Sequence, residues 1–290
     1  MDIGRLGLWF FLDTMPSADA AAFVQQIERL GYPALWLPEA VGREPFATAG
    51  FVLARSERIV IATGIANIWA RDPMTMAAGQ KTLAEQSGNR FLLGIGVSHA
   101  PLVGLRGHAY TKPLSYMREY LEKMQTAPFM AVPPSEPPPT VIGAIRPKMV
   151  ALAGERVQGV HPYFVPPEHT ARTRKQLGPD KWICTAQAVI LESDPVKARA
   201  AARQYMQTYV PALPNYTNNL RDLGWTDADF ADGCSDRLVD AIVAWGDERK
   251  IRERFDAHYR AGASHVCFLP LRSDSVPLPD MRAIEAFRPA

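Results

Sequence analysis

The stretch that decides the fold is residues 58–73, RIVIATGIANIWARDP. Its first half, RIVIAT, has the β-branched and apolar composition of a buried strand. The second half differs, because Gly64 is followed by Asn67 and Trp69 before Pro73 opens a helical pattern. A buried strand that ends in a glycine and in large polar and aromatic side chains is typical of a parallel sheet whose strand ends carry a site.

Outward from this stretch, short apolar runs alternate with longer helical patterns along the chain. The strand-like runs span residues 5–11, 34–38, 58–63, 91–97, 140–143, 157–161, 182–190 and 265–269. The helical patterns span residues 18–30, 46–55, 73–87, 113–125, 147–154, 167–177, 194–209 and 247–261. This α/β alternation predicts a (β/α)8 TIM barrel with insertions. A doubly wound open sheet is the alternative, but it usually has a glycine-rich turn after its first strand, and LWFFLDTMP has none.

Two segments interrupt the alternation. Residues 127–140, APFMAVPPSEPPPT, are rich in proline and could join two domains. Because the alternation resumes directly afterwards, we expect a surface connection inside one domain that spans residues 1–290. Residues 211–246 are expected to form an irregular insert with several helical pieces.

Composition excludes several classes of function. The net charge is +2, from 32 basic and 30 acidic residues that are interspersed, so we expect no nucleic-acid and no membrane partner. No apolar run is long enough for a transmembrane helix, and the N-terminus lacks the order of a signal peptide. Three widely spaced cysteines fit neither a disulfide framework nor a zinc site. We expect a cytoplasmic protein without a metal centre.

The carboxyl ends of the strands should converge at one mouth of the barrel. Candidate site residues at these ends are Phe10, Glu39, Gly64, Ile65, Asn67, Trp69, Gly96, Ser98, His99, Gly143, Ala144, Ile145, Arg146, His161 and Tyr163. Each also has an ordinary structural interpretation: Glu39 could be a helix-start or surface carboxylate, His99 a satisfied structural histidine, and Trp69 a cap on the barrel. Arg71 could simply pair with Asp72 or Glu85.

The chemistry of this mouth points to a planar ligand. No HExxH or G-x-S-x-G motif is present, which argues against a zinc protease and a serine hydrolase. The mouth is aromatic and apolar with a few polar groups, as suits a planar heterocycle. The turn before the helix at Pro147 offers backbone N–H groups to a phosphate, with Arg146 and Lys148 adding charge.

These stretches, in their order, resemble the bacterial luciferase-like superfamily, and within it the F420-dependent oxidoreductases of actinobacterial type. The resemblance covers about residues 5–210 and rests on LWLPEAVGREPF, RIVIATGIANIWARDP, NRFLLGIGVSHAPLVGLRGHAY and VIGAIRPKMVALAGERVQGVHPYFVPPEHT. It implies a (β/α)8 barrel that holds coenzyme F420, or FMN, at the C-terminal mouth. It also implies a cis peptide bond between Gly64 and Ile65, in a bulge at the end of the third strand, and a possible homodimer.

The resemblance assigns roles by position. It implies cofactor binding by Glu39, Gly64, Ile65, Asn67, Gly96, Ser98, Gly143, Ala144, Ile145, Arg146 and His161. Phe10, Trp69 and Tyr163 are expected to form the substrate pocket. Three departures stand out, because relatives have a histidine where Ala40 stands, a carboxylate where His99 stands and a second glycine where Arg146 stands. The first two argue against a sugar-phosphate substrate.

The activity that follows is hydride transfer between a deazaflavin and an unidentified small organic substrate. His99 is the expected acid or base, with Glu39 or His161 as second candidates. An FMN-dependent monooxygenase of the same superfamily is the enzyme alternative. A non-catalytic flavin-binding protein is the alternative from another class.

Overall fold

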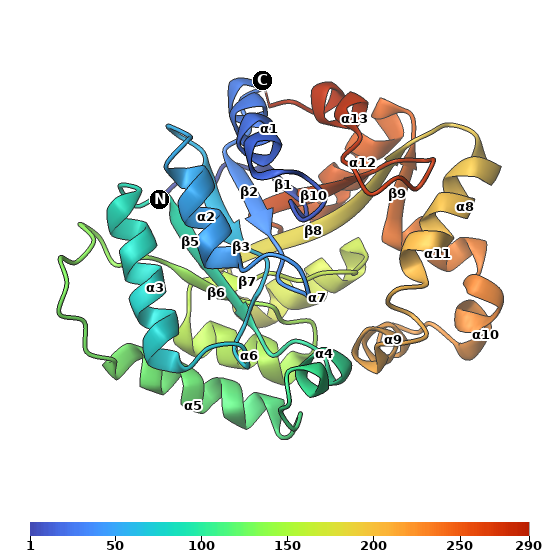
Figure 1. The fold of residues 1–290 in the computed structure, drawn as a ribbon. Coiled ribbons are helices and arrows are strands. Elements are labelled where there is room, and N and C mark those ends of the chain that lie inside the picture. The colour runs from blue at the N-terminus through green and yellow to red at the C-terminus, as the bar shows by residue number, and fades with distance from the viewer. Residues whose placement is uncertain (290) are drawn as a thin grey trace.

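Parallel strands form a closed barrel at the centre of the molecule, in a computed structural model that describes residues 1–289 (Figure 1). In barrel order the strands are β1 (Leu6–Trp9), β2 (Ala34–Leu37), β3 (Val60–Thr63), β5 (Phe91–Gly96), β6 (Thr140–Ile142), β7 (Gly159–Val160), β8 (Trp182–Leu191) and β10 (His265–Leu271). β10 pairs with both β8 and β1, which closes the ring. The predicted (β/α)8 barrel is confirmed.

Helices surround the barrel as an outer layer. They are α1 (Ser17–Arg29), α2 (Pro45–Leu53), α3 (Pro73–Gln86), α5 (Pro113–Thr126), α6 (Pro147–Arg156), α7 (Pro167–Leu177), α8 (Pro195–Met206), α12 (Glu248–Arg260) and the short α4 (Ala100–Leu105) and α13 (Met281–Ala286). The start of α3 shows why these bounds hold. Pro73 takes the first helical position, and the Asp72 carboxylate accepts from the N–H groups of Met74 and Thr75.

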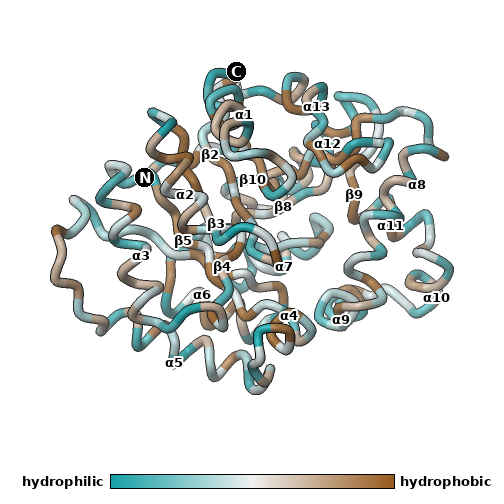
Figure 2. Tube along the Cα trace, viewed as in Figure 1, coloured by the Kyte–Doolittle hydropathy of each residue, from teal (hydrophilic) through white to brown (hydrophobic). Residues whose placement is uncertain are grey.

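Hydrophobic residues concentrate on the strands (Figure 2), and their buried side chains form one core cluster with those of the covering helices. A second apolar cluster lies beyond the end of β8 and joins α8 to the insert. No helix in residues 1–289 has the length and hydropathy that crossing a bilayer requires.

The insert contains α9 (Pro214–Arg221), α10 (Asp227–Phe230), a 3-10 turn (Ala231–Gly233) and α11 (Asp236–Ile242), as expected, and one strand that was not expected. This strand, β9 (Val243–Gly246), pairs with residues 188–191 at the end of β8. It follows α11 without a turn residue, and a four-residue apolar run cannot be distinguished from the end of a buried helix by periodicity. The sequence therefore predicted the helical pieces of the insert and not the strand at its end.

The proline-rich residues 127–140 run from α5 to β6. The Gln80 side-chain amide donates to the carbonyls of Pro138 and Pro139 and to the Thr140 hydroxyl. These contacts tie the connection to α3, as expected of a surface segment inside one domain. That the whole chain is one domain stays a prediction.

Candidate active site

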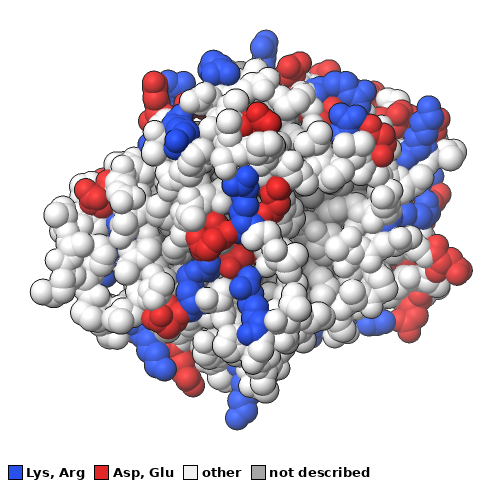
Figure 3. Space-filling model, in the orientation of Figure 1, with Lys and Arg blue, Asp and Glu red and all other residues white. Residues whose placement is uncertain are grey.

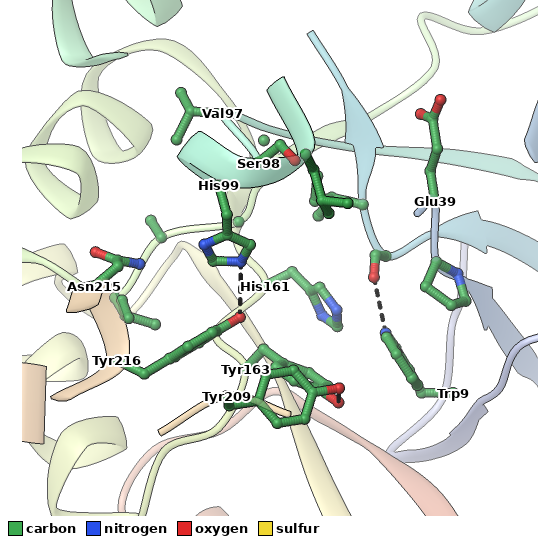
Figure 4. A pocket seen from close by; sticks show the side chains of 18 of the residues that line it. Trp9, Glu39, Val97, Ser98, His99, His161, Tyr163, Tyr209, Asn215 and Tyr216 are labelled. Atoms are coloured by element: carbon green, nitrogen blue, oxygen red, sulfur yellow. Dashed lines mark hydrogen bonds between the residues drawn. The ribbon is translucent and has the colours of Figure 1, made fainter. Parts of the chain in front are cut away.

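A pocket that opens to solvent at its mouth lies at the carboxyl ends of the strands. Figure 4 shows Trp9, His99, His161, Tyr163 and Tyr216 around a common space, and the Glu39 carboxylate directed away from it. The lining residues are Trp9, Phe11, Pro38, Glu39, Gly64, Ile65, Gly96, Val97, Ser98, His99, Leu102, Gly143, Ala144, Ile145, His161, Tyr163, Tyr209, Asn215 and Tyr216. Most residues proposed from the sequence therefore meet in one place.

The end of β3 is a bulge. Four steps along the chain from Ala62 to Ala66 match three steps along β5 from Leu92 to Ile95, after which β4 (Ala66–Asn67) resumes pairing with β5. The peptide bond between Gly64 and Ile65 is cis, as the resemblance implied.

Glycines on the neighbouring strands make room for this bulge. A Cβ at Gly96 would lie 2.7 Å from the Ile65 side chain, and one at Gly143 would lie 3.2 Å from it. A Cβ at Gly94 would lie 2.0 Å from the Thr63 carbonyl oxygen. Because Gly96 and Gly143 lack side chains, Ile65 packs into the strand ends and forms an apolar part of the pocket wall.

Trp9 and Phe11 line the pocket, and Phe10 does not. Phe10 is buried, and its ring centroid lies 6.4 Å from that of Phe23 on α1, between barrel and helix layer. Successive side chains of an extended chain point to opposite faces, so Phe10 cannot share a face with its neighbours. The assignment of Phe10 to the substrate pocket was wrong, and Trp9, which donates from Nε1 to the Gly64 carbonyl at 2.9 Å, replaces it.

Glu39 is held by an ion-pair cluster at the rim. Its Oε2 accepts from Arg71 Nη1 at 2.8 Å and from the Asn67 backbone N–H at 2.7 Å. Its Oε1 accepts from Arg71 Nη2 at 3.1 Å and from Arg106 at 3.4 Å. Arg71 also pairs with Glu44, so its partners are neither Asp72 nor Glu85. Acidic and basic side chains lie side by side near the middle of this face (Figure 3).

His161 presents an unpartnered nitrogen to the pocket. Its ring stacks on Trp36 at 4.4 Å, and Nδ1 lies 2.8 Å from the Cys184 carbonyl, to which it donates. Burial lowers the pKa of His161 to about 4, so the ring is neutral and Nε2 carries a lone pair. Nε2 is buried without a hydrogen-bond partner among the described residues. A Cβ at Gly64 would lie 2.9 Å from it, which places this acceptor at the floor beside the bulge.

His99 lies on the opposite wall, directly before α4. Its Nε2 is 3.4 Å from the Tyr216 hydroxyl, and Figure 4 shows the two side chains facing each other. Burial lowers the pKa of His99 below its usual value. The imidazole is therefore unprotonated at neutral pH and can accept a proton.

Besides Phe10, three proposed residues do not line the pocket. Asn67 is buried in β4, where its side-chain oxygen accepts from the Trp69 N–H. Trp69 stacks on Tyr116 at 4.2 Å and donates from Nε1 to the Val97 carbonyl, so it supports the rim. Arg146 points away from the floor and pairs with Asp222 at 3.2 Å.

The sequence analysis missed the wall that follows α8. Tyr209, Asn215 and Tyr216 lie at least 46 positions along the chain from any other lining residue. Tyr163 on the barrel meets this wall, because its hydroxyl lies 2.8 Å from that of Tyr209 and accepts from that of Tyr205 at 2.9 Å. The only available signal was the density of tyrosines in residues 205–216.

Fold and site together define a barrel protein with a flat, largely apolar ligand pocket at its C-terminal mouth. The chain belongs to the luciferase-like monooxygenase family, whose model matches residues 6–265. It is 24% identical, over 90% of its length and 92% of the relative's, to a Mycobacterium tuberculosis protein whose name proposes that it is a coenzyme F420-dependent oxidoreductase.

Solved structures share the fold along nearly the whole chain. An F420-dependent secondary alcohol dehydrogenase in complex with an F420–acetone adduct has a TM-score of 0.79 at 16% identity, with 98% of this chain and 97% of that one covered. The oxygenating constituent of 3,6-diketocamphane monooxygenase from Pseudomonas putida, in complex with FMN, has a TM-score of 0.74 at 15% identity, with 98% and 96% covered.

Proposed function

We propose that the chain is an F420-dependent oxidoreductase that transfers a hydride between the deazaflavin and a small organic substrate. The observation that carries this proposal is the pocket floor, where the apolar Ile65 lies beside the unpartnered acceptor His161 Nε2. A planar ring with an N–H or O–H donor fits this floor, and the deazaflavin of F420 carries such donors. Family membership and relatives named for F420 favour this cofactor over other planar rings.

Several residues of the pocket would hold the cofactor. The Ile65 wall, seated against Gly96 and Gly143, would support the ring, and His161 Nε2 would accept one of its hydrogen bonds. The Gly143 N–H already donates to the Ile95 carbonyl, so the N–H groups of Ala144 and Ile145 and the positive end of α6 would face the phosphate. When bound, the deazaflavin would accept or donate a hydride at its ring carbon C5.

His99 Nε2 would receive a proton from the Tyr216 hydroxyl, which would take the substrate proton in exchange, so that the two groups together accept one proton. Glu39 is unsuited to that task, because both its oxygens already accept from cationic groups. We therefore assign Glu39 a positioning role, since it fixes the Asn67 N–H at the start of β4.

Titration of the purified protein with F420 and, separately, with FMN tests the proposal, and fluorescence of either cofactor reports binding. We expect F420 to bind and to be reduced or reoxidised with a substrate, and FMN to bind far more weakly. Binding of FMN alone, with turnover that consumes oxygen, would instead support the monooxygenase. Tight binding without any turnover would support a flavin-binding protein.

The variant His99→Gln tests the proton step. We expect kcat to fall by about 100-fold, while the dissociation constant of F420 stays unchanged, because His99 manages a proton and does not hold the ring. Because burial lowers the pKa of His99, oxidation of an alcohol should keep a constant rate around neutral pH and slow only in solution more acidic than the usual titration range of histidine. Unchanged turnover in the variant would remove His99 from the reaction.

A further inference from the structure

The wall after α8 makes one side of the pocket aromatic. Tyr209 and Tyr216 have ring centroids 5.6 Å apart, and Tyr163 lies 6.2 Å from Tyr216 and 4.9 Å from Trp9. Figure 4 shows Tyr163, Tyr209 and Tyr216 along one side of the pocket, with His99 and Asn215 beside Tyr216 and Trp9 across from them. A surface of this kind favours a ligand with a ring, because aromatic contacts add to the burial of apolar area.

The same pocket offers no free charge. Among the described residues that line it there is no lysine or arginine, and its one acidic side chain, Glu39, is neutralised by Arg71. Both lining histidines are neutral at pH 7 because burial lowers the pKa of each. A carboxylate or phosphate on the substrate would find no cation on these walls.

The guanidinium groups nearest to the pocket are already engaged. Arg106 donates to the Ala40 carbonyl and contacts Glu39, Arg146 pairs with Asp222, and Arg172 donates to the Asn219 side chain. None could turn to a substrate anion without giving up such a contact. An anion that enters the pocket gives up its hydration without gaining a cationic partner, and this cost lowers its affinity for the protein. An uncharged molecule of the same shape does not have this cost.

One polar pair remains available on the aromatic side. The contact between the Tyr216 hydroxyl and His99 Nε2 is long, at 3.4 Å, so either group can also meet an oxygen of a substrate. Beside it the Asn215 side chain is exposed at the mouth. The polar groups on this side therefore match one uncharged oxygen, such as that of an alcohol or a ketone.

Building on the proposed function, we infer that the substrate is an uncharged ring-bearing molecule with one alcohol or carbonyl oxygen, and that the Tyr163, Tyr209 and Tyr216 wall selects it. The ring lies against these tyrosines, and its oxygen faces His99 and Tyr216. The inference concerns charge and shape, and it holds for the pocket with or without the cofactor.

A matched pair of probes tests this selection: 2-acetylnaphthalene, which is uncharged, and 2-naphthoate, which has nearly the same shape and a negative charge. Equilibrium dialysis gives their dissociation constants with the F420-loaded protein and with the cofactor-free protein. We expect the ketone to bind more tightly by at least about tenfold in both forms. Equal affinities, tighter binding of the carboxylate, or no binding of either probe would overturn the inference.

Adding a cation to the wall should reverse the preference. Asn215→Lys places an ammonium group at the pocket mouth, on an exposed helix position that tolerates the change, and should raise affinity for 2-naphthoate by about tenfold. Ala212→Lys adds the same charge at an exposed residue of the preceding loop that does not line the pocket, and should leave both affinities unchanged. Equal gains in the two variants would mean that overall charge, and not the pocket wall, governs binding.

Failure of the proposed function gives a separate result. F420 loading is measured first by its own fluorescence, and absence of loading contradicts the proposed cofactor while the probe comparison on the cofactor-free protein still tests the pocket. Loading without the expected probe preference contradicts the substrate class alone.

Discussion

Glu39 and Arg71 form a nearly buried ion pair whose loss should destabilise the fold. Their side chains are 5% and 9% exposed. Burial alone would lower the pKa of Arg71, and the contacts with Glu39 and Glu44 raise it above its usual value. Glu39→Ala leaves the guanidinium with only the half-exposed Glu44 and removes the acceptor of the Asn67 N–H. We expect the free energy of unfolding to fall by about 3–5 kcal/mol.

A double-mutant cycle separates the pair from its surroundings. Arg71→Ala and the double variant complete the cycle, with urea unfolding at pH 7 as the assay. The two parallel hydrogen bonds, at 2.8 and 3.1 Å, predict a coupling energy of about 1.5–3 kcal/mol. The exposed pair Arg249 and Glu253 on α12 serves as the control and should couple by less than about 0.5 kcal/mol. A coupling at Glu39 as small as the control's would refute the assignment of Glu39 as a structural anchor of the rim.

Two further predictions follow from burial and close packing. Burial lowers the pKa of four histidines to about 3 or 4, namely His161, His169, His258 and His265. Below pH 6.5 these side chains therefore bind protons in the unfolded chain but not in the folded chain. Stability should therefore fall between pH 7 and pH 5, by on the order of 1 kcal/mol for each histidine, and equal urea midpoints at the two pH values would contradict this. Gly96→Ala places a Cβ 2.7 Å from Ile65 and should weaken F420 binding about tenfold, whereas Gly104→Ala, which meets no atom within 4 Å, should leave it unchanged in the same titration.

The barrel was predictable because its signals are local. Apolar runs, helix starts such as Asp72–Pro73 and their regular alternation are all visible within short windows of sequence. The strand ends then indicated the pocket, because parallel strands of a barrel point their carboxyl ends to one side. The pattern failed at β9, where helix and strand adjoin without a turn.

Side-chain direction and distant contacts were harder to predict. The error at Phe10 arose because the sequence does not show which residues of the first strand face the barrel interior. A shift of one residue moves a side chain to the opposite face. The partners of Arg71 could not be predicted without the path of the loop after β2. This loop brings Glu39 and Glu44 to Arg71 from about 30 positions earlier in the chain. Prediction of the tyrosine wall would have required the path of the insert across the barrel mouth. No local sequence pattern indicates that path.

The central claim is that F420 binds in this pocket with His161 Nε2 as one of its hydrogen-bond partners. The most direct measurement is the dissociation constant of F420 for the wild type and for His161→Phe, which keeps a ring against Trp36 and removes the acceptor. His258→Phe is the matched control, because His258 is also buried, does not line the pocket, and places its ring nitrogens against Thr170 and Gln187. We predict that His161→Phe weakens F420 binding by about 10-fold and that the control leaves it unchanged. F420 affinity that is the same in all three proteins, or no F420 binding by the wild type, would contradict the account.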